Sequence, residues 1–202
     1  MRKAAVVLVT GVILFLTVAA FAQENRSEIS LQGTGLFTKD TSGNGNSYSA
    51  TESGGFLGTY RYHLNHWLSA EAAYGYSLDT QKYSSAGAFR IQSHIHQLTG
   101  AMILNLPSRP SPRISPYVIA GGGALLFSPA GNQLDSLSGA QFQAKPAFVY
   151  GVGANYAIQK HISLRMEYRG FLYSTPDFGF GGLATNSLTH TAMPSVGMTF
   201  RF

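Results

Sequence analysis

The sequence predicts an all-β fold, an eight-stranded antiparallel up-and-down transmembrane β-barrel, and three observations lead to it. Eight segments alternate apolar residues with polar or small ones, as strands with two different faces do. The connections between these segments are long and short by turns. Charged residues make up only 11% of the chain and aromatic residues 12%, and no apolar run after residue 22 is long enough for a spanning helix.

The first 22 residues have the pattern of a secretory signal peptide that is cleaved before Gln23. A basic start precedes a long apolar run that ends in the small-residue cleavage site Ala20-Phe21-Ala22. A retained transmembrane helix is the alternative, but the polar residues from Gln23 onward favour cleavage. The predicted organisation is therefore a signal peptide, 1–22, and a single β-barrel domain, 23–202.

The composition excludes several kinds of site and partner. The chain has no cysteine, which excludes disulfides, zinc–thiolate sites and cysteine nucleophiles. Without Arg2 and Lys3 of the signal peptide, 12 basic residues face 9 acidic ones, a formal charge of +3. This small excess contains no basic cluster interleaved with aromatic residues, so no nucleic acid is predicted as a partner.

The first four predicted strands cover 27–37, 54–64, 68–78 and 89–106. The facing of the fourth is ambiguous, and we favour Leu98 and Met102 outward with Thr99 inward. The residues expected to face outward are Ile29, Leu31, Phe37, Phe56, Tyr60, Tyr62, Leu64, Leu68, Ala70, Ala72, Tyr74, Tyr76, Leu98, Met102, Leu104 and Leu106. Those expected to face inward are Gln32, Thr34, Arg61, His63, Ser69, Glu71, Ala73, Gly75, Ser77, Thr99 and Asn105.

The connections of this half are two loops and a turn. The stretch 38–53, rich in Ser, Gly and Asn, predicts a long flexible loop, and 79–88 predicts a polar one. Asn65-His66 is a short turn, and the neighbouring Trp67 is typical of a membrane–water interface.

The last four predicted strands cover 116–127, 147–159, 162–173 and 188–202. Segment 116–127 is apolar on both faces, so its facing stays open. Outward residues are expected to be Phe148, Tyr150, Val152, Ala154, Tyr156, Ile158, Leu164, Met166, Tyr168, Leu172, Ala192, Pro194, Val196, Met198, Phe200 and Phe202. Inward residues are expected to be Gly151, Gly153, Asn155, Ser163, Arg165, Glu167, Arg169, Thr189, Thr191, Met193, Ser195, Gly197, Thr199 and Arg201. Turns are predicted at 107–115 and at Lys160-His161, and long loops at 128–146 and 174–187.

The chain ends on Phe200-Arg201-Phe202, and this ending resembles the closing strand of bacterial outer-membrane β-barrels. With its eight strands and inward ionisable residues, segment 23–202 resembles the small OmpA-type and OmpX-like outer-membrane β-barrel family. The resemblance implies the bacterial outer membrane as location, with both termini on the periplasmic side. It also implies outer-membrane lipid, lipopolysaccharide and the barrel assembly machinery as partners, with Phe200 and Phe202 as the C-terminal assembly signal. Many OmpA-type proteins continue into a peptidoglycan-binding domain, which this sequence does not contain.

The inward ionisable residues are the main candidate site. They are expected to form a lumen charge network of Arg61, Glu71, Arg165, Glu167, Arg169 and Arg201. A charge in a small lumen is costly unless it is paired, so these residues predict salt bridges. Because an eight-stranded barrel is about wide enough to be filled by side chains, we interpret the network as a structural plug. A narrow ion path that opens when the pairs exchange partners is the alternative.

Two further patterns carry less weight. His94 and His96 share one face of a strand, but no third ligand is near them in sequence, so no metal and no cofactor are predicted. His161-Ile162-Ser163 resembles the His-x-Ser pair of outer-membrane lipid A deacylases. It lies at a predicted periplasmic turn, and Glu167 is better explained by Arg165 and Arg169, so no enzyme activity is predicted.

The sequence thus predicts a structural or envelope role, or a surface-interaction role, for an outer-membrane barrel. Possible surface ligands would bind through the loops 38–53, 79–88, 128–146 and 174–187. A small porin or channel for ions or small solutes is the alternative, and an outer-membrane lipid hydrolase is a third hypothesis. A soluble periplasmic β-sandwich or lipocalin-like carrier also stays open, because alternation does not say whether the apolar face meets lipid or a protein core.

Overall fold

The computed structural model describes residues 26–39, 41–43, 46–50, 53–84, 88–107, 113–129, 142–175 and 188–202. The regular structure in these ranges is ten antiparallel strands of one sheet. A search of this part of the chain found no helix that is long and apolar enough to span a membrane. The predicted signal peptide, 1–22, lies outside the described residues and stays a prediction.

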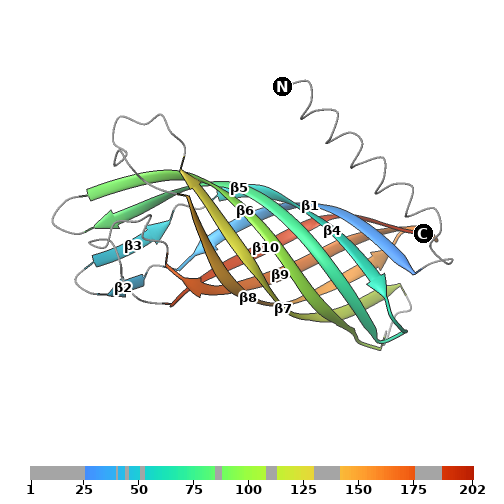
Figure 1. The fold of residues 1–202 in the computed structure, drawn as a ribbon. Helices are drawn as coiled ribbons and strands as arrows, with labels where there is room; N and C mark the ends of the chain where they lie inside the picture. The colour runs from blue at the N-terminus through green and yellow to red at the C-terminus, as the bar shows by residue number, and fades with distance from the viewer. Residues whose placement is uncertain are drawn as a thin grey trace, which may run out of the picture.

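Eight long strands form a closed up-and-down barrel (Figure 1). They are β1 (Ser27–Thr38), β4 (Ser53–His63), β5 (Leu68–Ser84), β6 (Ala88–Asn105), β7 (Ile114–Pro129), β8 (Gln143–Ala157), β9 (Ile162–Ser174) and β10 (Leu188–Arg201). Each pairs with the barrel strands before and after it, and β1 pairs with β10 to close the sheet. Closure satisfies the backbone hydrogen bonds along both edges, which is what a sheet in lipid requires. The predicted fold class is confirmed.

The register of the strands determines the width of the barrel. Hydrogen-bonded partners followed from Glu28 once around the sheet return to β1 at Thr38, ten residues farther along. An eight-stranded barrel tilts its strands strongly and leaves an interior just wide enough for side chains. Ser27 and Phe202 pair at one end of the barrel, which we call the proximal end, and the opposite end is the distal end.

The predicted facing of the strands is confirmed. Leu31 and Leu98 point outward and are 66% and 60% exposed, whereas Gln32 and Thr99, one position along, are buried. The facing of β7, which the sequence left open, follows from its inward residues. These are Tyr117, Ile119, Leu125 and Phe127, all buried.

Two of the predicted distal loops are wrong in part, because strands continue through them. Segment 38–53 contains β2 (Thr41–Gly43) and β3 (Asn46–Ala50), which pair with each other. In segment 79–88, β5 continues to Ser84 and pairs there with both β3 and β6. Outside the apolar part of a membrane both faces of a strand can carry polar side chains, so hydrogen-bonded pairing continues after the alternation has ended.

Other boundaries move by a few residues. Strand β7 begins at Ile114, inside the predicted turn 107–115, and ends at Pro129. Strand β8 begins at Gln143, so both ends of the predicted loop 128–146 are strand. Ser174 belongs to β9. The remainder of these two loops, 130–141 and 176–187, lies outside the described residues.

Candidate functional site: a lumen in two layers

The side chains inside the barrel form two layers, and strand β9 crosses both. From the proximal to the distal end, its inward residues are Arg165, Glu167, Arg169, Phe171 and Tyr173. All five are at most 5% exposed. The chemistry changes from charged to apolar between Arg169 and Phe171. We call the proximal part the ion-pair layer and the distal part the apolar layer.

Four residues of the ion-pair layer form a closed ring of alternating charge. Arg61 places Nε 2.9 Å and Nη2 2.8 Å from Oε2 of Glu71. Arg169 donates to the other oxygen of Glu71 and to Oε1 of Glu167. Glu167 in turn lies 3.7 Å from Arg61. Each carboxylate therefore lies between two guanidinium groups, which compensates the buried charges.

Glu28 of β1 gathers the cations on the proximal side of this ring. Its Oε2 accepts a hydrogen bond from Nη2 of Arg165 at 2.7 Å. Its Oε1 faces Arg201 and also lies 3.0 Å from Nε2 of His63. Nη1 of Arg165 is 3.5 Å from Glu71, which connects Glu28 to the ring. One carboxylate thus serves two arginines and a histidine.

Tyr117 of β7 completes the ion-pair layer. It lies between β5 and β9, where the intervening strands contribute no charge to the ring of Arg61, Glu71, Arg169 and Glu167. Its ring centroid lies 4.2 Å from the guanidinium carbon of Arg61, a cation–π contact. Its hydroxyl donates to Glu167 at 2.6 Å. Gly153 makes room for the ring, because a Cβ at that position would lie 2.5 Å from it. Tyr117 therefore contacts both charges of the pair Arg61–Glu167.

The structure brings the six predicted network residues into contact. The inner five are at most 5% exposed, and the side chain of Arg201 is 41% exposed at the proximal end, where it joins through Glu28. Sequence reasoning missed Glu28 and Tyr117. Glu28 had a signal, since the alternation of 27–37 places it on the same face as Gln32. Tyr117 had none, because its strand is apolar on both faces.

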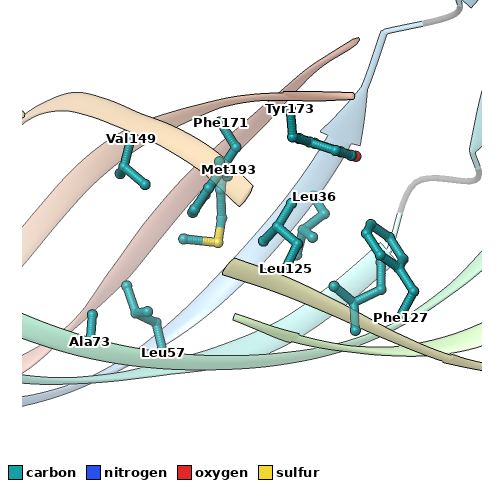
Figure 2. Close-up of a cluster of buried hydrophobic side chains, with 11 residues drawn as sticks. Leu36, Leu57, Ala73, Leu125, Phe127, Val149, Phe171, Tyr173 and Met193 are labelled. Carbon is teal, nitrogen blue, oxygen red and sulfur yellow. The ribbon is translucent and has the colours of Figure 1, made fainter. Parts of the chain in front are cut away.

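The apolar layer closes the distal half of the lumen (Figure 2). It consists of Leu36, Leu57, Ala73, Ile95, Leu125, Phe127, Ala147, Val149, Phe171, Tyr173 and Met193. Every barrel strand contributes at least one of these residues, and in Figure 2 the labelled side chains converge from opposite walls. The cavity left between several of these residues and the polar Thr38, Gln97 and Thr191 measures about 10 Å³, room for about one water molecule. This layer was not predicted, because the inner face was expected to be polar or small.

The two layers fill the lumen with different chemistry. An apolar constriction offers an ion no ligand to replace its water of hydration, and it excludes water from the path. The ion-pair layer fills its part of the lumen with paired charges, although Nη1 of Arg61 and Nη1 of Arg169 are buried without a hydrogen-bond partner.

Three histidines on the outer surface are hydrogen-bonded to tyrosines. The pairs are His94 with Tyr76 and His96 with Tyr74, each at 2.8 Å, and His190 with Tyr150 at 2.9 Å. All six side chains lie at outward positions, between the middle of the barrel wall and its distal end. Aromatic side chains that carry a polar group suit the border between the apolar and polar parts of a membrane. Among the described residues there is no group of three or more His, Cys, Asp or Glu that could hold a metal ion.

The residues that a Ser–His hydrolase, the third hypothesis, would need are not assembled. Nδ1 of His161 lies 3.0 Å from the backbone carbonyl of Arg201, to which it donates. Ser163 pairs with Thr199 in the barrel wall. Glu167, the nearest carboxylate in sequence, is held by Arg169 and Tyr117 in the ion-pair layer. A nucleophile, a base and an orienting carboxylate would have to be in mutual contact for that chemistry.

Phe200 and Phe202 lie where the barrel closes. Phe202 exchanges two backbone hydrogen bonds with Ser27, at 2.9 and 3.0 Å. The rings of Phe200 and Phe202 stack with centroids 6.0 Å apart, and Phe200 is 51% exposed on the outer surface. The proposed assembly signal is thus accessible from outside the barrel, while its recognition stays a prediction.

Comparison with known proteins gives one family and several similar structures. A family model described as "Outer membrane protein beta-barrel domain" matches residues 8–202. Neisserial surface protein A shares 15% identity at a TM-score of 0.61, over 87% of this chain and 97% of its own. OprG from Pseudomonas aeruginosa shares 13% identity at a TM-score of 0.63, over 89% and 97%. Ail of Yersinia pestis, solved with the heparin analogue sucrose octasulfate, shares 16% identity at a TM-score of 0.54, over 89% and 100%.

No curated protein matches the sequence. At identities of 13–16%, the similar structures show the fold alone. That fold, together with the family model, excludes the soluble sandwich and the lipocalin-like carrier, because the outward apolar face meets lipid.

Proposed function

The chain belongs to the outer membrane protein beta-barrel domain family, and from this premise we propose that it is a sealed barrel with an envelope or surface-interaction role. Its location is the bacterial outer membrane, and the predicted resemblance to small OmpA-type and OmpX-like barrels is confirmed. Members of such a family include adhesins, structural proteins and small-molecule channels. The proposal selects among these roles.

The observation that carries the proposal is the two-layered lumen. The apolar layer takes side chains from all barrel strands and leaves a cavity of only about 10 Å³. The ion-pair layer below it joins β1, β4, β5 and β9 through paired charges. A lumen filled in this way favours an envelope or surface-interaction role over a channel.

The interacting parts are proposed to be the distal segments 38–53, 79–88, 128–146 and 174–187. Strand β3 and the end of β5 continue the sheet at this end, which gives such a surface a fixed support. The proximal end, with Ser27 and Phe202, is proposed to face the periplasm, as expected for a chain delivered from the inside. The Ail structure with a heparin analogue is an example of a surface ligand on a barrel of this fold.

Other partners follow from the outer surface. Outer-membrane barrels contact lipid and lipopolysaccharide, and the outward Leu, Phe and Tyr residues supply an apolar belt for that contact. The Tyr–His pairs lie between the middle of the barrel wall and its distal end. Phe200 and Phe202 are proposed to be recognised by the barrel assembly machinery.

The sealed lumen is tested by single-channel conductance of the refolded protein in a planar bilayer. Only material whose gel mobility shifts on heating is used, so that a silent result refers to a folded barrel. We expect no discrete conductance steps. Reproducible steps would contradict the seal and favour the channel for ions or small solutes, and their alteration in Arg169→Gln would place the path through the ion-pair layer.

The surface role is tested separately by adding protease to intact cells. Cleavage is expected within the four distal segments, because these project outside. The proximal turns at 65–66 and 160–161 are expected to be protected until the outer membrane is permeabilised. Cleavage at the proximal turns in intact cells would reverse the proposed orientation.

A further inference from the structure

The proximal mouth of the barrel is a polar cavity of about 400 Å³ below the ion-pair layer. Four of its lining residues carry or can carry positive charge: Arg26, His63, His66 and Arg201. No Asp or Glu is among the described residues that line it. The nearest buried carboxylate, Glu28, is already engaged by Arg165, Arg201 and His63. The cavity is therefore electropositive.

The balance of charges in the ion-pair layer also indicates positive charge at the proximal end. Its four arginines face three glutamates, Glu28, Glu71 and Glu167. The ring pairs Arg61 and Arg169 with Glu71 and Glu167. Arg165 and Arg201 share the carboxylate of Glu28, and Arg165 has only a longer contact, of 3.5 Å, with Glu71. The uncompensated positive charge thus lies at the proximal end, where the side chain of Arg201 is 41% exposed to the cavity.

Two asparagines add hydrogen-bond donors to this charge. Oδ1 of Asn65 accepts the backbone N–H groups of Trp67 and Leu68 at 2.9 and 2.8 Å. Oδ1 of Asn155 accepts from Nε of Arg165 at 2.8 Å. With their oxygens occupied, both amides offer NH₂ groups to a ligand. Asn105 is the exception, because its NH₂ group donates to Ser69 and its oxygen is left.

The floor of the cavity is held in place. His63 lies between Glu28 at 3.0 Å and Oγ of Ser69 at 2.8 Å, and Ser69 also accepts from Asn105 at 2.9 Å. These bonds fix the orientation of the imidazole, so the positive lining does not need to be ordered when a ligand binds.

We propose that this cavity is a binding site for a phosphate group. A phosphate carries several acceptor oxygens, which suits a cavity lined by guanidinium, imidazole and amide donors. The group could belong to free phosphate or to a lipid headgroup. Leu64 and Leu106 also line the cavity and are 47% and 41% exposed, so an apolar surface continues from the polar mouth toward the outside of the barrel. The site is independent of the proposed surface role, which concerns the opposite end.

The test uses the full mature chain refolded in alkyl glucoside micelles, which contain no phosphate. Inorganic phosphate is titrated against sodium chloride of equal ionic strength, with binding followed by calorimetry and by the fluorescence of the single tryptophan, Trp67. A second arm adds phosphatidylglycerol to the micelles. Saturable binding of inorganic phosphate alone identifies free phosphate, and clearly tighter binding of the lipid identifies a headgroup. No saturable binding in either arm overturns the proposal.

Variants tie the binding to this cavity. Arg201→Gln is expected to weaken phosphate binding by about tenfold, the effect of losing one charge-assisted contact. Because Arg201 also contacts Glu28, Arg26→Gln serves as a second variant that leaves the ion-pair layer intact. Lys160→Gln is the matched control: it removes one positive charge at an exposed proximal turn outside the cavity. If Lys160→Gln weakens binding as much as the cavity variants do, the effect is general surface charge and the proposed site is wrong.

Discussion

The ion-pair layer and the apolar layer fill one lumen with opposite chemistry. In the first, each group needs a particular partner, as Glu71 needs both Arg61 and Arg169. In the second, residues such as Leu57 and Phe171 need only neighbours of suitable volume. A buried charge that loses its partner is left uncompensated, whereas an apolar residue that shrinks leaves a small void. The loss of free energy of unfolding should therefore depend on the layer in which a substitution is made.

The largest effect is expected for Glu71→Gln, which keeps the shape of the side chain and removes its charge. Arg61 and Arg169 would both lose a carboxylate in a site without solvent contact. Breaking a buried ion pair in this way typically lowers the free energy of unfolding by about 3–5 kcal/mol. Urea unfolding in micelles, followed by Trp67 fluorescence and gel mobility, would measure it.

A double-mutant cycle sharpens this prediction. Arg61→Gln removes the main partner of Glu71, so the double variant should be destabilised by less than the sum of the single ones. A coupling of about 2 kcal/mol is expected for direct contacts in one network. Strictly additive effects would show that the pairing of Arg61 with Glu71 contributes little, and would contradict the contrast drawn between the layers.

A smaller loss of unfolding free energy is expected for Leu57→Ala in the apolar layer. The residue is 1% exposed, and its truncation leaves a cavity that costs about 2–3 kcal/mol, in the lower part of the range for buried leucines. The hydrogen-bonded wall around it remains. Leu98→Ala is the matched control, since Leu98 is 60% exposed on the outer surface. Equal losses at both positions would mean that the apolar layer is not packed as a core.

Gly153→Ala tests the ion-pair layer with a single added methyl group. The new Cβ would lie 2.5 Å from the ring of Tyr117, which would have to leave Glu167 or Arg61. Overpacking of this kind costs about 1–3 kcal/mol. Gly100→Ala provides the control, because a Cβ there has no heavy atom within 4 Å. A loss of stability in Gly100→Ala alone would be the opposite of the expected result.

The sequence was informative where one face of a strand met lipid. Strand β9 alternates Leu164, Met166 and Tyr168 with charged residues, so its facing and its part of the ion-pair layer could be predicted. The same reasoning failed on β7, where Tyr117 and Ile119 face inward beside an equally apolar outer face. Alternation reports a difference between two faces, and an apolar lumen removes that difference.

The extent of the strands was predictable only within the membrane. The distal end of β5 carries polar residues at successive positions, 79–82, and was therefore predicted as a loop. Its pairing with β3 and β6 is made by backbone groups, which leave no signal in side-chain polarity. Several of the carboxylate–guanidinium pairs were equally hidden, because they join strands that are distant in sequence, such as β1 and β9 in the pair Glu28–Arg165. The pair Arg61–Glu71 is different, since it joins register partners on the neighbouring strands β4 and β5.

The smallest effect on stability is expected when a tyrosine is replaced by phenylalanine, once inside the barrel and once on its outer surface. Tyr173→Phe removes a hydroxyl that lies 3.0 Å from Thr191 in the apolar layer, where the lost bond should cost about 1 kcal/mol. Tyr150→Phe removes the bond to His190 on the outer surface, where water and lipid headgroups can take its place, so a loss below about 0.5 kcal/mol is expected. Parallel urea unfolding of both variants measures the difference. A larger loss for Tyr150→Phe would assign the outer Tyr–His pairs a structural weight that only the lumen is expected to carry.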